Sequence, residues 1–249
     1  MVTQSEFLDK YKITAAAFSA TGLEWNGLTR IQEDYTRCQP NLEPVARYVT
    51  DCLRQVEAVH SLKIRLKEPE HVIEKIIRRK IEDPSLAVSV ENYKDKITDL
   101  IGIRALHLFK EDWAQIHSFI TATWELAEKP TANVRRGDAE SFINEFMAKG
   151  CEVKEHIHGY RSVHYLVKSQ PTKDVHLVEV QVRTIFEEAW SEIDHRLRYE
   201  YGADSPLLNQ YLFIFSRLAG SADEMASFAR YLKSELEGSV GRQEEAIKK

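Results

Sequence analysis

The sequence lacks the features that mark secreted and membrane proteins. It has three cysteines, Cys38, Cys52 and Cys151, whose odd number and wide spacing fit neither a disulfide framework nor a metal-binding cysteine motif. No apolar run reaches the roughly 18–20 residues that a membrane span needs. The N-terminal residues contain no apolar segment of the kind found in secretory signals. We therefore expect reduced thiols, a cytoplasmic location and no membrane partner.

An excess of positive charge is also missing. The chain has 34 Lys and Arg against 39 Asp and Glu, which gives a formal net charge of −5. This balance argues against a general nucleic-acid coat protein, so any site for a polyanion must be local. Hydrophobic residues make up 43% of the 249 residues, which is enough for a core. The length fits one compact domain with helical extensions, or at most two small domains.

Hydrophobic periodicity predicts an α/β fold. We expect helices over residues 1–60, interrupted at Pro40-Asn41, and at 70–81, 111–127, 138–149, 184–201 and 205–236. We expect strands at 61–67, 100–109, 151–156, 162–167 and 175–183. Because strands and helices interleave, the fold class is α/β, with a mixed sheet of about five strands flanked by helices. The expected domains are a helical extension at 1–60, a central domain at 61–203, and a C-terminal helix with a polar tail at 204–249.

Positive charge is concentrated in residues 61–80. Strict alternation along the first part of this segment places Lys63, Arg65 and Lys67 on one face of a strand. The helix that follows carries a basic stripe made of His71, Lys75, Arg78 and Arg79. A solvated surface is one interpretation. A polyphosphate site is the other, because two basic faces can converge there.

A second motif is the segment Val178–Thr184. The valines alternate toward the core, so Glu179, Gln181 and Arg183 share the opposite face of the strand. Such a face can pair across strands, or its carboxylate can hold a cation or a proton.

Two more motifs stand at strand ends. Asp99 precedes a strand in which Gly102 allows close backbone approach, and Arg104, inserted among apolar residues, needs a protein or ligand partner. Later in the chain, Gly159-Tyr160 enters another strand, and the tyrosine can serve either the core or a nucleobase.

The last predicted helix carries a heptad seam. Its members are Tyr211, Phe215, Leu218, Ala222, Met225, Ala229, Leu232 and Leu236. We expect this seam to pack against the N-terminal helices of the same chain. The alternative is a contact between subunits, which would make the protein a homo-oligomer through its C-terminal helix.

Taken together and in order, the motifs resemble the synthetase domain of the RelA/SpoT-type alarmone synthetases. The matching residues are Arg65, Lys67, Lys75 and Arg78, then Asp99, Gly102 and Arg104, then Gly159 to Ser162 with His164, then Glu179, Gln181, Arg183 and Thr184. With no His-Asp hydrolase domain ahead of it, the chain is similar to a small stand-alone synthetase. The resemblance implies a nucleotidyltransferase-like fold that moves pyrophosphate from ATP to the ribose 3′-hydroxyl of GDP or GTP. The products would be the stringent-response alarmone (p)ppGpp and AMP.

The resemblance also implies a role for individual residues. The expected ATP-binding residues are Arg65, Lys67, His71, Lys75, Arg78 and Arg104, of which Arg65 and Arg104 would flank the adenine. Asp99 and Glu179 match the carboxylates that hold Mg²⁺, and Glu179 is also the candidate base for the acceptor hydroxyl. The expected acceptor-binding residues are Tyr160, which would stack on the base, with His158, Arg161, His164, Gln181 and Ser191. His158 and Ser191 stand at positions that the family uses near the guanine edge, and both can form hydrogen bonds.

Two other functions remain open. The chain could be a toxin-like pyrophosphotransferase that acts on the 3′ end of tRNA or on adenosine nucleotides. A tRNA substrate would need a basic track, for which Arg135-Arg136 with Arg196 and Arg198 are candidates. The chain could also be a catalytically silent nucleotide-binding regulator, but the expected catalytic carboxylates and basic residues argue against this. Conversion of ATP to AMP separates the enzymes from the regulator.

Overall fold

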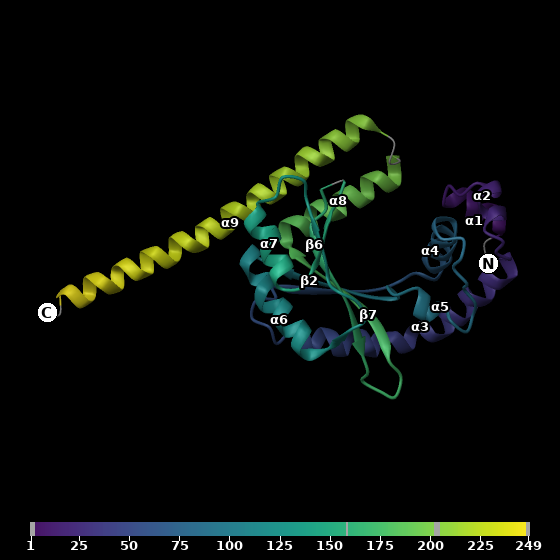
Figure 1. The fold of residues 1–249 in the computed structure, drawn as a ribbon, viewed down its shortest axis with the longest axis horizontal. Helices are drawn as coiled ribbons and strands as arrows, with labels where there is room; N and C mark the ends of the chain where they lie inside the picture. The colour runs from purple at the N-terminus through teal and green to yellow at the C-terminus, as the bar shows by residue number, and fades with distance from the viewer. Residues whose placement is uncertain (1–2, 158, 202–204, 248–249) are drawn as a thin grey trace. The chain divides into compact units, whose positions relative to one another are not determined.

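The structure is a computed structural model, and it describes residues 3–157, 159–201 and 205–247. Its elements are shown in Figure 1. The helices are α1 (Gln4–Lys10), α2 (Ala15–Ala20), α3 (Trp25–Leu53), α4 (Pro69–Glu82), α5 (Tyr93–Lys96), the short 3₁₀ helix η1 (Lys110–Asp112), α6 (Trp113–Thr123), α7 (Glu140–Ala148), α8 (Ile185–Tyr201) and α9 (Pro206–Ile247). The strands are β1 (Ser61–Leu66), β2 (Ile101–His107), β3 (Glu125–Leu126), β4 (Thr131–Val134), β5 (Glu152–Glu155), β6 (Ser162–Ser169) and β7 (His176–Thr184).

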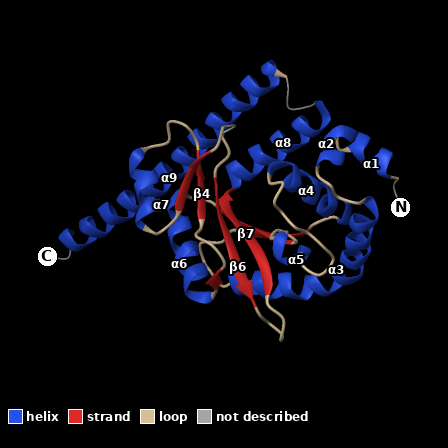
Figure 2. Cartoon of the chain, turned by 45° about the vertical axis from the view of Figure 1, so that its right-hand side comes forward, coloured by secondary structure: helices blue, strands red, loops and turns tan. Residues whose placement is uncertain are grey.

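The strands form a mixed sheet with the order β1-β2-β7-β6-β4-β5, and β3 pairs with β6. β4 runs parallel to β5 and antiparallel to β6. β6 and β7 are long neighbours joined as a hairpin (Figure 2). The α/β class with a mixed sheet is confirmed, but the described residues form seven strands rather than about five. The sequence did not predict β3 and β4, because two and four residues are too short to show an alternating pattern.

The chain groups into two compact units, each built from three separate segments. The first unit contains the described residues of 1–50, 64–103 and 166–179. The second unit contains the described residues of 51–63, 104–165 and 180–249.

The first unit is organised around α3 and α4. α4 buries one apolar stripe, made of Val72, Ile73, Ile76 and Ile77. The basic stripe lies on its other side, so the predicted helix over 70–81, with one apolar and one basic face, is confirmed. The Tyr35 hydroxyl on α3 donates a hydrogen bond of 2.7 Å to the Lys67 carbonyl, which fixes the chain where β1 leads into α4.

α3 continues without a break through Pro40 and Pro44, so the predicted interruption at Pro40-Asn41 is wrong. A proline inside a helix removes one hydrogen bond and crowds the preceding turn. The apolar face of α3, however, is buried on both sides of these prolines, at Leu28, Ile31, Tyr35, Leu42, Val45 and Val49. Because tertiary packing supplies most of the stability of a helix, this buried face offsets the local cost of the prolines.

In the second unit, α8 and α9 lie side by side (Figure 1). The indole N–H of Trp190 on α8 donates a 2.9 Å hydrogen bond to the Leu212 carbonyl on α9. The buried positions of α9 are Leu212, Ser216, Ala219, Gly220 and Asp223. Leu212, Ser216, Ala219 and Asp223 each follow directly after a member of the predicted heptad seam, so the buried face is rotated by one residue from that seam.

The predicted seam is therefore exposed. Tyr211, Leu218 and Met225 are 64%, 61% and 73% accessible to solvent. The expectation that the seam is buried within the chain is wrong, because the buried face of α9 is a different one, made of Leu212 and of small or polar residues.

α9 also extends to Ile247, whereas the predicted helix ends at residue 236. Neither α9 nor any other helix in the described part of the chain combines the length and the hydropathy of a membrane span.

Candidate functional site

The first unit brings three of the predicted site residues into contact. Lys67 follows β1, Lys75 lies on α4, and Asp99 precedes β2. The ammonium nitrogens of Lys67 and Lys75 each lie 2.7 Å from Asp99 Oδ2. The three side chains are 13%, 26% and 18% exposed, respectively, so the ion pairs are partly shielded from water. Two cations and a carboxylate that the sequence assigned to phosphate and metal thus form one cluster, which we call the Asp99 cluster.

The second carboxylate oxygen of Asp99 remains available for a ligand. Oδ1 is buried and has no hydrogen-bond partner among the described residues. Burial by itself would raise the pKa of Asp99, but the charges of Lys67 and Lys75 outweigh it and hold the pKa below its ordinary value. Asp99 is therefore ionised at neutral pH, with one buried oxygen that no described residue contacts by a hydrogen bond.

These properties fit a hard cation such as Mg²⁺, which prefers carboxylate, phosphate and water oxygens. In the part of the chain that the structure describes, no group of three or more His, Cys, Asp or Glu could hold a metal ion by itself. Any metal bound at Asp99 would thus depend on oxygens supplied by a ligand or water. Glu179, the other expected carboxylate, belongs to the same unit and is half-buried on β7.

The other predicted ATP-binding residues of the first unit lie on β1 and along α4. Arg65 is exposed on β1, and Arg78 is exposed on α4 in an ion pair with Glu74. His71 lies edge-on to the Tyr11 ring, with 5.8 Å between the ring centroids. Burial lowers the pKa of His71, and the charges of Arg65 and Lys67 add to this effect against the opposing charge of Glu74. His71 is therefore neutral at neutral pH and acts as a polar rather than a cationic group.

In the second unit, three of the predicted acceptor-binding residues meet around Arg183. Its Nη1 donates hydrogen bonds to the Tyr160 hydroxyl, at 3.2 Å, and to the Ser191 hydroxyl, at 3.0 Å. The guanidinium lies over the Tyr160 ring, 5.5 Å from its centroid. His164 Nε2 is 2.9 Å from the same tyrosine hydroxyl. The ring and polar groups that the sequence assigned to the acceptor are thus held by an arginine that it did not assign a role.

Arg183 is in turn connected to Arg104 on β2. Glu188 Oε2 lies 2.5 Å from Arg183 Nη2, and Glu188 Oε1 accepts a 2.9 Å hydrogen bond from Arg104 Nη1. Arg104 also pairs with Glu192, one turn further along α8. Burial would lower the pKa of Arg104, but the hydrogen bond to Glu192 and the charge of Glu188 raise it. The predicted need of Arg104 for a partner is confirmed, and in the described structure the partners are protein carboxylates.

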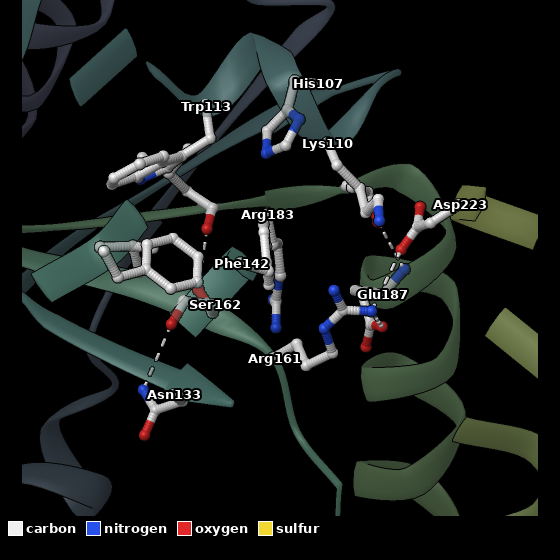
Figure 3. Close-up of a pocket in the computed structure, with 14 residues that line it drawn as sticks. His107, Lys110, Trp113, Asn133, Phe142, Arg161, Ser162, Arg183, Glu187 and Asp223 are labelled. Carbon is white, nitrogen blue, oxygen red and sulfur yellow. Dashed lines mark hydrogen bonds and ion pairs between the residues drawn. The ribbon is translucent and has the colours of Figure 1, made fainter. Parts of the chain in front are cut away.

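Arg161 lies in a different environment, beside a small cavity (Figure 3). Its guanidinium is 3.3 Å from Asp138, 3.4 Å from Glu187 and 3.8 Å from Asp223, and all four side chains are at least nine-tenths buried. The cavity measures about 40 Å³, which is room for water but not for a nucleotide. Arg161 thus connects β6 to α8 and α9, and its predicted part in acceptor binding stays a prediction.

The two glycines singled out in the sequence differ in what they require. Gly159 has a φ of +78°, and a Cβ at this position would lie 2.6 Å from Ser216 Oγ, so a side chain cannot be accommodated. At Gly102, a Cβ would lie 3.5 Å from the Arg65 carbonyl oxygen, which is an ordinary contact. The expected close approach at Gly102 is therefore wrong, whereas the turn before β6 depends on Gly159.

Three remaining predictions concern the second unit. His158 lies outside the described residues. Gln181 is half-buried on β7. Arg135, a candidate for a tRNA-binding track, is buried and pairs with Asp138 and the Ser216 carbonyl, so it cannot contribute to a surface track.

The sequence missed Glu188 and Glu192, and it left Arg183 without a role. A signal was present, because the two glutamates stand four residues apart on α8 and so share a face. Arg183 also continues the polar face of Glu179 and Gln181 along β7. Sequence alone, however, does not tell which strand that helix face covers.

Comparisons with known proteins agree with this architecture. A family described as "Region found in RelA / SpoT proteins" matches residues 64–204. The chain is 25% identical to the GTP pyrophosphokinase YwaC of Bacillus subtilis (strain 168) over 189 residues, which cover 72% of this chain and 73% of that protein.

Two solved structures have a similar fold. The small alarmone synthetase 1 from Bacillus subtilis superposes with a TM-score of 0.53 at 22% identity, covering 84% of this chain and 96% of that one. A GTP pyrophosphokinase family protein from Streptococcus pneumoniae gives a TM-score of 0.56 at 21% identity, covering 95% and 97%. At these identities, the likeness shows the fold.

Proposed function

The chain belongs to the RelA/SpoT family, and we propose that it is a pyrophosphokinase. It transfers pyrophosphate from ATP to the ribose 3′-hydroxyl of GDP or GTP, and releases (p)ppGpp and AMP. A catalytically silent regulator is disfavoured, because the ionised Asp99 and the lysines paired with it are present in one cluster.

The observation that carries the proposal is the Asp99 cluster. Lys67 and Lys75 provide positive charge within 2.7 Å of one carboxylate oxygen, and the other oxygen has no protein partner in the described structure. A polyphosphate needs fixed cations of this kind, and a divalent cation needs a buried, ionised carboxylate. We assign ATP to this cluster, with Arg65, His71 and Arg78 of the same unit as its further ligands. For Arg104, in the second unit, contact with the adenine is the role that the resemblance implies, and it stays a prediction.

In the transfer, the acceptor 3′-oxygen attacks the β-phosphorus of ATP. The new O–P bond forms at this phosphorus, the bond to the oxygen bridging the α- and β-phosphates breaks, and its electron pair leaves with AMP. Negative charge therefore grows on the bridging oxygen and on the oxygens around the β-phosphorus, where Lys67 and Lys75 would stabilise it. The hydroxyl proton must leave as the bond forms, and we assign this proton to Glu179.

We propose that Asp99 and Glu179 hold Mg²⁺ when ATP is bound. The ion would neutralise phosphate oxygens, while Asp99 contributes through its free Oδ1. Because no group of three or more His, Cys, Asp or Glu among the described residues could hold a metal ion, phosphate and water oxygens would supply the remaining ligands.

The acceptor is assigned to the cluster around Tyr160. The ring provides a flat face for a base, and stacking tolerates any base. Guanine selection would come from hydrogen bonds to its Watson–Crick edge, for which Ser191 and His158 are the proposed partners. A tRNA acceptor has less support, because one of the two arginines next to each other in the expected track is buried.

We also propose that the apolar face of α9 binds a second copy of this chain. Its exposed members are Tyr211, Ile214, Leu218, Met225, Phe228 and Leu232. They recur at spacings of three, four and seven, which is the seam of a coiled coil between like helices. A cytoplasmic location stays a prediction.

The test uses ATP labelled on the γ-phosphate, incubated with GDP, GTP, AMP, ATP or uncharged tRNA in parallel. We expect the label to move to GDP or GTP with equal release of AMP. Label found mainly on tRNA or on an adenosine nucleotide would overturn the guanosine assignment, and no AMP in any reaction would overturn the enzyme.

The matched control is Glu179→Gln, which keeps the shape of the side chain and removes its charge. We expect the chain to fold and the transfer to fall by about 100-fold or more, the range typical for loss of an essential acid–base group. A rate within about threefold of wild type, roughly 0.65 kcal/mol in the barrier, would show that Glu179 is neither ligand nor base.

A further inference from the structure

Glu188 occupies a position that links the two arginines of the second unit. One carboxylate oxygen lies 2.9 Å from Arg104 on β2, and the other lies 2.5 Å from Arg183 on β7. β2 and β7 are neighbouring strands, and Glu188 reaches both from α8. We propose that Glu188 is a positioning residue that couples ATP binding at Arg104 to acceptor binding at Tyr160, and this inference rests on the proposed function.

The contacts are shielded from water. The side chains of Arg183, Glu188 and Arg104 are 2%, 13% and 16% exposed. Charge pairs in such surroundings are weakly screened by salt, and removal of one partner leaves the other charge buried without compensation. Glu188 therefore helps to orient each arginine, and a movement of its carboxylate changes the position of both guanidinium groups.

The acceptor side of this connection is specific. Arg183 holds the Tyr160 hydroxyl and the Ser191 hydroxyl with the same Nη1, while its Nη2 faces Glu188. The Nη2 to Oε2 contact is an ion pair whose alignment is not that of a hydrogen bond, so both groups retain hydrogen-bonding capacity. The orientation of the tyrosine ring therefore depends on where Glu188 holds the guanidinium.

The physical consequence is cooperativity. When adenine fixes the plane of Arg104, it also fixes the carboxylate of Glu188, and hence Arg183 and the Tyr160 ring. The first nucleotide to bind then orders these side chains and bears the loss of conformational entropy. The second nucleotide binds a site that is already ordered. By thermodynamic linkage, each nucleotide raises the affinity of the other by the same factor.

The experiment measures the dissociation constant of a non-hydrolysable ATP analogue with and without saturating GDP, and that of GDP with and without the analogue. In the wild-type chain we expect each ligand to tighten the other at least threefold. In Glu188→Gln, we expect this factor to fall to about one, and the KM values for ATP and for the acceptor both to rise at least fivefold. A change in kcat alone, with coupling intact, would overturn the proposal.

The matched control is Glu192→Gln. Glu192 pairs with Arg104 and lies 3.7 Å from Lys63, and within the described residues it has no hydrogen bond or ion pair with Arg183. We expect this variant to raise the KM for ATP while the acceptor KM stays that of wild type. If Glu192→Gln and Glu188→Gln behave alike, the link through Arg183 is contradicted.

A second variant distinguishes a loss of coupling from a folding defect, and the wild-type chain distinguishes failure of this inference from failure of the proposed function. Glu188→Asp keeps the charge but shortens the side chain, so it should fold as wild type in circular dichroism and lose most of the coupling. Coupling of wild-type strength in Glu188→Asp would overturn the proposal even if Glu188→Gln does not fold. If the wild-type chain transfers no pyrophosphate, the proposed function fails, whereas transfer without coupling defeats only this inference.

Discussion

At the scale of single residues, the two carboxylate oxygens of Asp99 are in opposite situations. Oδ2 accepts from two lysines, and Oδ1 has no partner among the described residues. The first contact stabilises the free chain, and the second is the property that a metal-binding residue needs. Substitution at this position should therefore affect both stability and activity.

We expect Asp99→Asn to lower the transfer rate by about 100-fold or more, because the charge that faces the phosphates and metal is lost. The same variant should lose about 1–3 kcal/mol of unfolding free energy, since Lys67 and Lys75 keep their charges without a counter-ion. Rates from labelled ATP and urea unfolding would measure the two effects. Asp95→Asn, an exposed carboxylate in the same unit, is the control and should stay within about 0.5 kcal/mol of wild type.

Tyr160 offers a second pair of variants. Tyr160→Ala removes the stacking face and should raise the acceptor KM by about 10- to 100-fold, which corresponds to about 1–3 kcal/mol for one stacked base. Tyr160→Phe keeps the ring and loses only the hydroxyl that Arg183 and His164 contact, so the increase should be smaller, about fivefold. The acceptor KM at saturating ATP measures both. An alanine variant with the wild-type acceptor KM would remove Tyr160 from the acceptor site.

Sequence predicts which residues share a strand face well where a strand alternates. The faces of β1 and β7 follow directly from period two, so the exposed Lys63 and Arg65 and the polar Glu179 and Gln181 stand where alternation puts them. Partners are harder to predict. Nothing in the spacing indicates that Arg104 faces Glu188 and Glu192, because these contacts depend on how a helix 80 or more residues later packs on the sheet.

At the scale of elements, α8 and α9 are joined to β6 by buried carboxylates. Burial, with the charge of Asp223 added, raises the pKa of Glu187 to about 7 against the opposing charge of Arg161. Burial also raises the pKa of Asp223 to about 6, against a hydrogen bond from Thr184 and the charge of Arg161. Both groups therefore retain protons in the folded chain at a pH where the unfolded chain has released them.

This difference gives a pH dependence with a definite sign. Between the unfolded pKa of Glu187, 4.5, and its folded pKa of about 7, unfolding releases a proton, so stability is greatest at the low end and falls as pH rises. We expect the unfolding free energy to be lower at pH 8 than at pH 5.5, by about 2 kcal/mol for this group, because only the part of the shift between pH 5.5 and about 7 lies in this window. Urea unfolding at the two pH values measures it.

Glu187→Gln provides the check, because the amide does not titrate. Its stability should change less between the two pH values than that of wild type. Glu235→Gln, an exposed position on α9, should keep the full wild-type change. If Glu187→Gln and wild type lose the same stability, the raised pKa of Glu187 is not the cause.

Some helices and strands were predicted accurately from the sequence and others were not, and the difference has physical reasons. α4 and β7 have long, regular patterns and were predicted to within a residue or two. α3 was predicted as two helices because Pro40 is normally a helix breaker, and the compensation comes from burial that a local pattern does not report. The α9 seam was placed correctly as an apolar stripe but given the wrong partner, since periodicity shows which residues share a face and not what covers that face.

At the scale of the whole molecule, the exposed apolar face of α9 predicts association between copies of the chain. Light scattering of the full chain should give a mass above 28.8 kDa that falls on dilution, as expected for a self-associating protein. Leu218→Glu combined with Met225→Glu should reduce the mass to 28.8 kDa, because both residues lie on the exposed seam. A wild-type monomer at every concentration would contradict the oligomer.

The control for this experiment is Lys233→Glu. It changes the charge of an exposed position on the same helix and leaves the apolar seam intact. Its mass should equal that of wild type, so that a loss of association in the double variant can be ascribed to the seam.

The division of the chain into two units could not be predicted from the sequence. Each unit combines three segments that are far apart in the chain, and β7 contributes to both units. Composition and periodicity report on neighbours along the chain, whereas these groupings depend on long-range contacts. The predicted boundaries at residues 60 and 203 follow changes of sequence pattern, and they stay a prediction.

The ion pairs of the Asp99 cluster make the binding of a polyphosphate and the binding of a divalent cation depend on each other. A polyphosphate arriving alone must draw Lys67 and Lys75 away from Asp99, which strands a buried negative charge. A divalent cation arriving alone meets a carboxylate that two ammonium groups already neutralise. If both arrived as one complex, the lysines would pair with phosphate instead of Asp99, and Asp99 would pair with the metal instead of the lysines, so that no charge would be left uncompensated. The three side chains would thus favour the magnesium complex of ATP, the ligand that we propose for this cluster, over a polyphosphate or a divalent cation by itself.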